Sequence, residues 1–296
     1  MNDYHKSVLV QEAIEGLKVV PGKKYIDATL GGGGHTRAII EKGGLVLGID
    51  VDQDAIDYVK KNFKFEILNL KLRLARANFS DIDKIAKDNG FEKANGILFD
   101  LGVSSHQLET GRRGFSYLKS GPLDMRMDQR LGVKGADLVN ALGKNELIAL
   151  FKNLGEEGRA RTIAQAIINK RRINPFKTTD DLIGILTKIY GFREITDFSK
   201  ATSGKKVFQA LRISVNDEIN SLKEALPKAA KLLEKDGRLA VITFHSLEDR
   251  IVKDEFLEFE KKQMGHVITK KPILPSPGEM EQNRRSKGAK LRIFQV

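Results

Sequence analysis

The 296-residue chain contains no cysteine, and this absence excludes a wide range of chemistry. Without a thiol the protein has no disulfide, no iron–sulfur cluster, no cysteine zinc site and no thiolate nucleophile. No apolar run approaches the roughly 18 residues of a transmembrane helix, and residues 1–6 lack the layout of a signal peptide. We therefore expect an intracellular protein without a membrane segment.

The composition is otherwise that of a folded protein. Hydrophobic residues make up 41% of the chain and charged residues 30%, which argues against wholesale disorder. At roughly 150 residues per domain, this length favours about two domains. Lys and Arg number 51 against 39 Asp and Glu, giving a net charge of +12.

The positive charge is unevenly distributed along the chain. The net charge is −1 over residues 1–110 and −3 over residues 211–260, but +9 over residues 111–210 and +7 over residues 261–296. This asymmetry indicates a near-neutral catalytic body with basic surfaces for a polyanion such as nucleic acid. The alternative is a solvated basic surface that only aids solubility.

Strand-like and helix-like segments alternate over the first 100 residues. Strand patterns cover residues 24–29, 45–50, 70–75 and 96–100, and helical patterns cover residues 8–17, 36–42, 54–62 and 81–89. Such alternation predicts a parallel sheet with helices on both of its faces.

The pattern changes after residue 110, where strand-like runs stop and helical, basic stretches follow. Residues 178–181 form a cap signal for a helix that runs to Tyr190. Two helices broken near Pro227 are expected over residues 210–233, before strands over residues 237–244 and 290–296. We predict a discontinuous α/β domain, residues 1–110 and 207–296, with an all-helical domain, residues 111–206, inserted into it.

A glycine run follows the first predicted strand, and Asp50 ends the second, 19 residues after the first of these glycines. Glycines let the backbone approach a ligand, and an acid at this offset binds ribose hydroxyls. The third small residue of the dinucleotide fingerprint is absent, because Thr36 or Arg37 occupies its position. The layout therefore favours S-adenosylmethionine over a dinucleotide. Asp27 is a candidate for binding its amino group, or else a turn cap.

Several long motifs identify a family. Residues 27–36 read DATLGGGGHT, residues 99–105 FDLGVSS, residues 121–128 GPLDMRMD and residues 242–250 ITFHSLEDR. In this order they resemble the bacterial small-subunit ribosomal RNA cytosine-N4 methyltransferase family, over residues 5–294. The resemblance implies a Rossmann-like S-adenosylmethionine-dependent methyltransferase fold with an inserted helical domain. It also implies a cytoplasmic enzyme that acts on 16S ribosomal RNA, in the context of the small ribosomal subunit.

The resemblance also implies a set of cofactor-binding residues: Gly33, Gly34, His35, Asp50, Phe79, Asp100 and Gln107. In this interpretation Asp50 holds the ribose hydroxyls and Phe79 flanks the adenine. A Phe in such a position is otherwise a core residue.

Asp100 is the candidate catalytic residue. The exocyclic nitrogen of cytosine is a poor nucleophile, because its lone pair is delocalised into the ring, so the enzyme needs an acceptor beside it. Asp100 provides one, or else serves only the cofactor. The missing cysteine excludes methylation at cytosine C5, which requires covalent attack on C6, but leaves an exocyclic nitrogen or a ribose oxygen open.

Candidate substrate-binding residues are basic, aromatic or placed just after a strand: Arg112, Arg113, Phe115, His245, Ser246, Arg284 and Arg285. A folded RNA must splay out a base, which Phe115 would stack unless it is a hinge anchor. His245 and Ser246 follow a predicted strand at the edge where α/β sites lie. Two alternative functions are a nicotinamide-dependent oxidoreductase and a non-catalytic RNA-binding ribosome assembly factor.

Overall fold

A computed structural model describes residues 7–191 and 202–296, and the chain divides into two compact units. The first unit comprises Met1–Ser104 and Ile219–Val296, and the second comprises Ser105–Glu218. The sequence-based prediction placed the two boundaries after residues 110 and 206.

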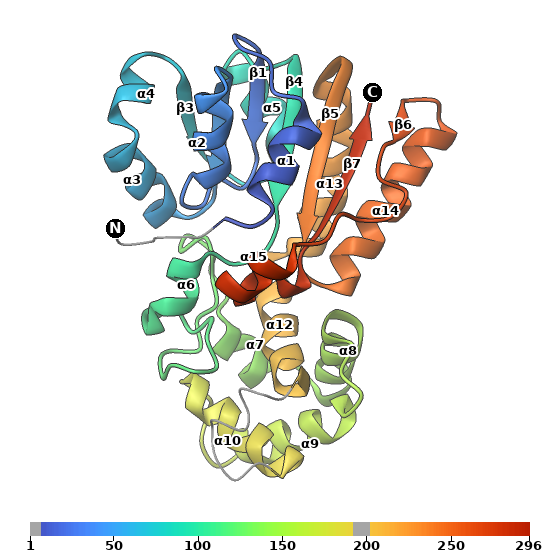
Figure 1. The fold of residues 1–296 in the computed structure, drawn as a ribbon. Helices are drawn as coiled ribbons and strands as arrows, with labels where there is room; N and C mark the ends of the chain where they lie inside the picture. Colours follow the sequence, from blue (N-terminus) through green and yellow to red (C-terminus); the bar gives the residue numbers. More distant parts are fainter. Residues whose placement is uncertain (1–6, 192–201) are drawn as a thin grey trace. The chain divides into compact units, whose positions relative to one another are not determined.

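The first unit is built on a seven-stranded sheet with the order β3-β2-β1-β4-β5-β7-β6 (Figure 1). The strands are β1 (Lys24–Asp27), β2 (Leu45–Asp50), β3 (Leu72–Arg76), β4 (Ala94–Asp100), β5 (Leu233–Thr243), β6 (His266–Val267) and β7 (Lys290–Gln295). Strands β1 to β5 are parallel, whereas β7 runs antiparallel to both of its neighbours. The strand order reverses between β1 and β4, the position at which doubly wound sheets bind ligands.

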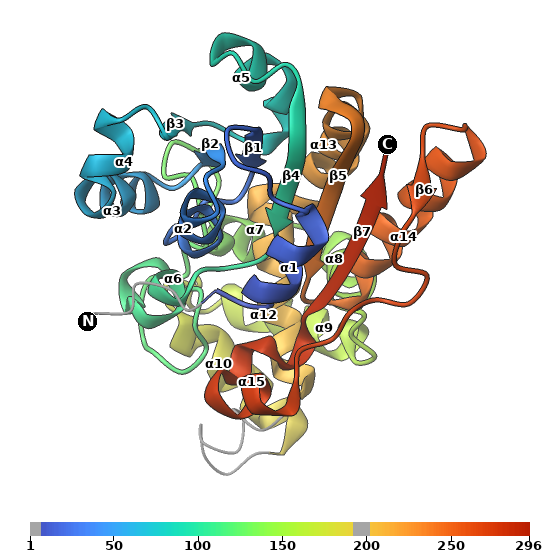
Figure 2. The same ribbon diagram turned by 45° about the horizontal axis from the view of Figure 1, so that its top comes forward.

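Side chains of the central strands alternate between two hydrophobic cores, one on each face of the sheet. On β4, Ile97 and Phe99 belong to one core and Leu98 to the other, as the two-residue period of a strand requires. The first core is covered by α5 (Ile82–Asp88), α13 (Glu218–Leu232) and α14 (Ser246–Lys261), and the second by α1 (Val10–Leu17), α2 (Gly34–Glu41) and α3 (Gln53–Asn62) (Figures 1 and 2). The predicted Rossmann-like α/β fold is confirmed.

In the described part of the second unit, the elements are helical. They are α6 (Ser105–Glu109), the 3-10 turn η2 (Gly111–Arg113), α7 (Gly135–Ala141), α8 (Lys144–Gly155), α9 (Ala160–Arg171), α10 (Thr179–Tyr190) and α12 (Thr202–Asn216). Thr178 caps α10 as predicted, since its hydroxyl accepts the N–H of Asp181 while the Asp181 carboxylate accepts the N–H of Thr178.

The break between α12 and α13 falls at Asp217, so its predicted position near Pro227 is wrong. Asp217 takes a left-handed conformation with φ 49°, whereas Pro227 lies inside α13. A proline in a helix removes one hydrogen bond. The residues around it are buried against the sheet, however, namely Ala225, Leu226, Ala229 and Ala230. Packing of this face therefore keeps the helix continuous.

Several short elements were not predicted from the sequence patterns. They include α4 (Lys64–Leu68), η1 (Phe79–Asp81), α6, η2, β6, α15 (Pro277–Gln282) and η3 (Arg284–Gly288). Each is too short for a periodic pattern to develop. Over residues 7–191 and 202–296, no helix has the length and apolar character that crossing a bilayer requires.

Candidate functional site

Three parallel strands of the first unit end in an aspartate: β1 in Asp27, β2 in Asp50 and β4 in Asp100. Because β1 pairs with both β2 and β4, the three carboxyl groups gather at one edge of the sheet, beside the switch point. Asp27 is 1% exposed and the side chain of Asp100 is 8% exposed. Placing several ionised carboxylates close together where water is largely excluded is unfavourable unless a nearby positive group offsets their charge.

Asp50 anchors the glycine loop between β1 and α2. The N–H of Gly31 donates to Asp50 Oδ2 at 2.8 Å, and the N–H of Asp52 donates to Oδ1 at 2.9 Å. Burial raises the pKa of Asp50 to about 6, although these two N–H groups act to lower it. Asp50 is therefore mainly ionised at neutral pH, and each of its oxygens has a second lone pair for a further donor.

The loop needs its glycines to turn between β1 and α2. Gly33 has φ 77°, and a Cβ there would lie 2.9 Å from the ring of Phe63. A Cβ on Gly34, the first residue of α2, would collide with the hydroxyl of Ser7. A side chain at either position would displace this turn from the carboxyl end of β1.

His35 is buried and connects the N-terminal segment to the strand ends. Its Nε2 lies 3.0 Å from the carbonyl oxygen of Val8, and since a carbonyl only accepts, Nε2 carries a proton. The other ring nitrogen, Nδ1, lies 3.5 Å from Asp100 Oδ2. The backbone N–H of Asp100 donates to Thr29 Oγ1 at 2.6 Å. The Asp100 backbone is thus fixed at the end of β4, and its carboxylate lies beside the His35 ring.

Asp27 is held by residues on both sides of the glycine loop. The Thr36 hydroxyl donates to Asp27 Oδ2 at 2.7 Å, and the N–H of Thr29 donates to Oδ1 at 3.3 Å. Burial raises the pKa of Asp27, while the nearby His35 and these hydrogen bonds act to lower it. Thr29 was not singled out in the sequence, and Thr36 was named only as a departure from the dinucleotide fingerprint, although their position beside the glycines and Asp27 was a usable signal. Asp27 does cap the turn, and its role towards a ligand stays a prediction.

Phe79 is half-buried in η1, directly after β3. Its ring packs edge-on against Phe99, with centroids 5.5 Å apart and an interplanar angle of 85°. The Asn78 side chain fixes this turn by accepting the N–H of Ser80 at 2.9 Å and donating to Ser221 Oγ at 3.2 Å. Phe79 is therefore partly a core residue. It belongs to the loop that follows β3, and its side chain is only half-buried there.

His245 and Ser246 lie at the carboxyl end of β5, where α14 begins. His245 is the N-cap, and its Nδ1 accepts the N–H of Glu248 at 3.3 Å. The buried Glu248 carboxylate accepts the N–H groups of Phe244 and His245 at 2.9 and 3.3 Å. This reciprocal capping box gives the motif a structural role, which the sequence analysis did not predict. Any contact of His245 or Ser246 with substrate stays a prediction.

Arg284 and Arg285 lie in η3 at the same edge of the sheet. A Cβ on Gly288 of η3 would lie 2.9 Å from the carbonyl oxygen of Phe244, at the end of β5. Preceding η3, Glu279 of α15 accepts the N–H of Leu9 at 2.8 Å, next to the residue that His35 contacts. Arg284 is exposed and Arg285 half-buried. Arg284 and Arg285 therefore lie near the carboxyl end of β5, next to β4, which ends in Asp100.

The other predicted site residues, Gln107, Arg112, Arg113 and Phe115, belong to the second unit. Arg113 and Phe115 are each 6% exposed. The Arg113 guanidinium donates to the carbonyl oxygens of Arg126 and Met127 at 2.8 and 2.6 Å and lies 5.6 Å from the Phe115 ring. Both residues therefore hold a loop together inside the unit. Gln107 is also buried, whereas Arg112 is exposed. Their roles towards cofactor or substrate stay predictions.

Comparison with known proteins identifies the family. The model of the MraW methylase family matches residues 2–296. The chain belongs to this family. It is 40% identical to the ribosomal RNA small subunit methyltransferase H of Brevibacillus brevis, over 98% of this chain and 97% of the relative. It is 42% identical to the protein of the same name from Clostridium botulinum, strain Loch Maree, with the same coverage. The Fusobacterium nucleatum protein of that name is 41% identical, over 99% of this chain and 97% of the relative.

Membership of the MraW family confirms the resemblance found in the sequence, and it makes the chain an S-adenosylmethionine-dependent methyltransferase. It does not favour the oxidoreductase or the non-catalytic assembly factor. The strand ends fit this cofactor, because a sulfonium and an ammonium group bring positive charge towards Asp27, Asp50 and Asp100. The two phosphates of a dinucleotide would bring negative charge to the same place.

Proposed function

We propose that this MraW-family protein transfers a methyl group from S-adenosylmethionine to the exocyclic N4 of a cytidine in 16S ribosomal RNA. The shared name of its relatives supports ribosomal RNA of the small subunit as the substrate, and the motif resemblance supports the N4 atom. The observation that carries the reaction class is the group of three aspartates at the carboxyl ends of β1, β2 and β4. The reaction takes place in the cytoplasm, in the context of the small ribosomal subunit.

The residues at the strand ends divide the binding of the cofactor between them. Asp50, ionised at neutral pH, accepts hydrogen bonds from the two ribose hydroxyls with the lone pairs that Gly31 and Asp52 leave. The accessible part of the Phe79 ring flanks the adenine, and Asp27 offsets the charge of the ammonium group. The full set of cofactor-binding residues comprises Gly33, Gly34, His35, Asp50, Phe79, Asp100 and Gln107.

S-adenosylmethionine, when bound, supplies an electrophilic methyl group on a sulfonium. The protein then has to align the amine, exclude water and accept a proton. Asp100 accepts an N–H of the cytosine amine, which concentrates electron density on the nitrogen, and it takes up the proton that the product nitrogen loses. The His35 ring, whose Nδ1 lies 3.5 Å from Asp100 Oδ2, positions the Asp100 side chain.

The second unit recognises the substrate. Over residues 105–218 there are 20 Lys and Arg against 13 Asp and Glu, and this excess favours binding of a polyanion. Exposed Arg112 in this unit, and Arg284 and Arg285 at the edge of the first unit, contact phosphates. Arg113 and Phe115 position the loop that carries Arg112, and His245 and Ser246 line the substrate side of the strand ends.

The test is to incubate the protein with methyl-labelled S-adenosylmethionine and naked 16S ribosomal RNA, small ribosomal subunits or duplex DNA. Nuclease digestion and mass spectrometry then locate the label. We expect label on cytidine N4 in ribosomal RNA, with the highest yield from small subunits. The Asp50→Ala protein controls for contaminating activity. Label on a ribose oxygen, or no label on any RNA, would contradict the proposal.

A further inference from the structure

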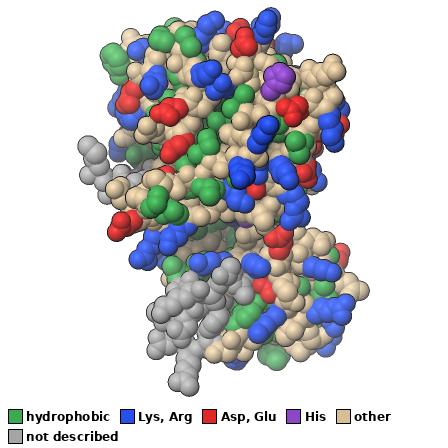
Figure 3. Space-filling view, turned by 45° about the vertical axis from the view of Figure 1, so that its right-hand side comes forward, with side chains coloured by type: hydrophobic (Ala, Val, Ile, Leu, Met, Phe, Trp, Pro, Cys, Tyr) green, Lys and Arg blue, Asp and Glu red, His purple; other side chains and the backbone are tan. Residues whose placement is uncertain are grey.

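Many cations of the second unit are engaged inside that unit. Arg159 donates to the carbonyl oxygen of Ile189, and Arg171 donates to those of Val139 and Leu142. Ion pairs join Arg130 to Asp128, Lys170 to Asp181 and Arg212 to Glu218. On the face drawn in Figure 3, acidic side chains are interspersed among the basic ones. Net charge alone therefore does not locate a binding surface, and the pairing of individual side chains has to be considered.

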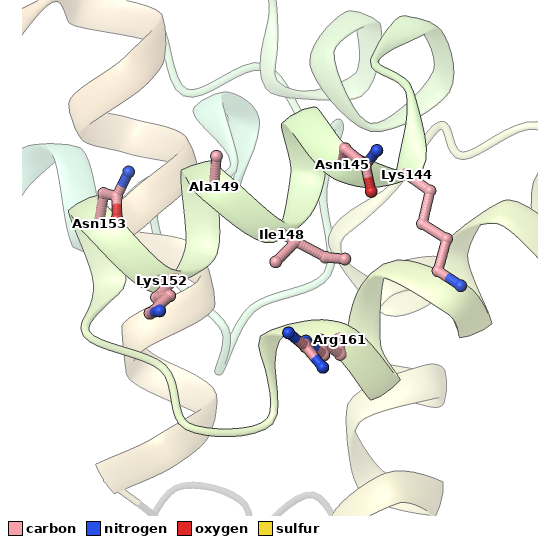
Figure 4. A pocket seen from close by; sticks show the side chains of 7 residues that line it. All are labelled: Lys144, Asn145, Ile148, Ala149, Lys152, Asn153 and Arg161. Carbon is pink, nitrogen blue, oxygen red and sulfur yellow. The ribbon is translucent and has the colours of Figure 1, made fainter.

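Three cations of this unit line one hollow and, among the residues that the structure describes, have no ion-pair or hydrogen-bond partner for their side chains. Lys144 and Lys152 of α8 and Arg161 of α9 surround a space of about 540 Å³ (Figure 4). All three are exposed, and across the described ranges 7–191 and 202–296 none of them makes an ion pair or a side-chain hydrogen bond. The remaining lining residues are uncharged: Asn145, Ile148, Ala149 and Asn153. We call this feature the basic hollow.

The lining residues of α8 repeat with the period of the helix. Lys144, Ile148 and Lys152 are spaced four residues apart and share one face of α8. Asn145, Ala149 and Asn153 have the same spacing and lie beside that face. At 1.5 Å per residue, the two lysines are separated by ~12 Å along the axis. Arg161, in the first turn of α9, faces α8 across the hollow (Figure 4). The first turn of α8 adds the positive end of its dipole.

The acidic residues closest in sequence do not neutralise the basic hollow. Glu146 caps its own helix, accepting the N–H of Gly143 at 2.6 Å. Glu157 is buried and accepts the N–H of Arg159 at 2.8 Å. Glu156, four residues after Lys152, accepts a hydrogen bond from Lys206 at its backbone carbonyl oxygen at 2.9 Å. None of these three acids lines the hollow. The three cations therefore remain a local excess of positive charge, which an anionic ligand would offset.

A second hollow, in the first unit, provides a contrast. It has a similar size, about 500 Å³, and three lysines also line it, but Glu92 and Glu234 lie among them. One of the three, Lys24, donates to the carbonyl oxygen of Gly90 at 2.6 Å. The positive and negative charges that line this hollow nearly cancel, so it has little attraction for a polyanion. Its other two lysines, Lys23 and Lys93, are exposed and serve as matched controls.

We propose that the basic hollow binds the phosphodiester backbone of the RNA substrate, an assignment that rests on the proposed function. The ~12 Å that separates the two lysines along α8 is greater than the width of one phosphate group. It corresponds to about three nucleotides of a stacked strand, at a rise of about 3.4 Å per nucleotide. Asn145 and Asn153 offer amide groups to phosphate oxygens and 2′-hydroxyls. Contacts of this kind fix the register and orientation of the RNA without reading its sequence.

The test compares two triple variants with the same change of charge. Lys144→Gln/Lys152→Gln/Arg161→Gln removes the basic hollow, and Lys23→Gln/Lys60→Gln/Lys93→Gln removes three exposed lysines of the first unit. Fluorescence anisotropy measures the binding of a labelled 16S ribosomal RNA fragment over a salt series. For the hollow variant we expect affinity near 0.15 M salt to fall roughly 10- to 100-fold and the salt slope to fall by about 2 to 3. The control should change less than about twofold.

Thermal melting by circular dichroism establishes that both variants are folded, and calorimetry with S-adenosylmethionine checks that the cofactor site is intact. If the two variants bind RNA equally, or if the loss is confined to one RNA sequence, the basic hollow is not a backbone site. A parent protein that binds no RNA would also overturn the proposal. A parent that binds RNA but methylates none would contradict the proposed function, while the difference between the variants would still decide the role of the hollow.

Discussion

The strand ends of the first unit and the basic hollow of the second are opposite in charge and in environment. Asp27, Asp50 and Asp100 are largely desolvated. Hydroxyl or backbone N–H donors hold Asp27 and Asp50 in place, and the backbone N–H of Asp100 donates to the Thr29 hydroxyl oxygen. Lys144, Lys152 and Arg161 are exposed on helix surfaces. A small cofactor that must present one methyl group needs groups with fixed positions. A long polyanion needs several cations that adapt to it.

The difference also has a thermodynamic side. Desolvated carboxylates are costly to the folded protein without a cation beside them, so the strand ends lower the stability of the folded protein unless a positive ligand offsets their charge. Solvated lysines cost the fold little, but salt screens them. The predictions below separate these two kinds of site, beginning with the largest expected effect.

Replacing Asp100 by Asn should have the largest effect. The amide has the same shape but is a weak proton acceptor, so the single-turnover rate at saturating cofactor should fall by about 10²- to 10⁴-fold. Rapid-quench measurement with methyl-labelled cofactor follows the rate. Asp57→Asn, at an exposed position of α3, should leave it unchanged. If the Asp100→Asn protein kept the full single-turnover rate, Asp100 would not be the proton acceptor and its role would be restricted to cofactor binding.

Asp50→Ala should weaken the binding of S-adenosylmethionine by about 10²- to 10³-fold. Two hydrogen bonds to a charged acceptor are lost, at about 1.5 kcal/mol or more each. The N–H groups of Gly31 and Asp52 also lose their acceptor. Calorimetry measures the affinity, and RNA binding by the same variant is the control and should be unaffected. Equal loss of both ligands would mean that the variant is misfolded.

Stability should depend on pH through Asp50. Its pKa is about 6 in the folded protein against about 3.9 in an unfolded chain. The folded form thus holds the proton more tightly, and stability falls as pH rises through this window. Relative to Asp50→Asn, which does not titrate there, the free energy of unfolding of the cofactor-free protein should fall by about 2 to 3 kcal/mol between pH 4 and pH 7. Urea titrations at both pH values measure it, and parallel curves for the two proteins would contradict it.

Salt should distinguish the two sites in the unmodified protein. Between about 0.05 and 0.2 M salt, RNA affinity should fall roughly 10- to 100-fold, as expected for a few phosphate contacts. The affinity for S-adenosylmethionine should change less than about twofold, because buried groups are screened little. Anisotropy and calorimetry measure the two affinities in the same buffers. If both ligands showed a similar salt dependence, the contrast between an exposed RNA-binding surface and a buried cofactor site would be wrong.

Much of the arrangement at the strand ends could be predicted from local sequence. A buried strand that ends in an acid, as at Asp50 and Asp100, and a run of glycines after Asp27 are contiguous patterns, and their chemistry follows from neighbours along the chain. The position of Asp217 could not be predicted in this way. Pro227 carries the stronger local signal for a helix break, but the packing of α13 on the sheet outweighs it.

Local patterns left open which polar groups pair with one another. Arg113 and Arg161 look equivalent in the sequence, yet one is buried against the carbonyl oxygens of Arg126 and Met127 and the other lines an unneutralised hollow. The chain order of residues was enough for the α/β architecture, the glycine turn and the acids at the strand ends, because these depend on neighbours a few positions apart. The tertiary structure alone decided which charges are neutralised, since their partners come from other helices and loops and pairing depends on distance in space.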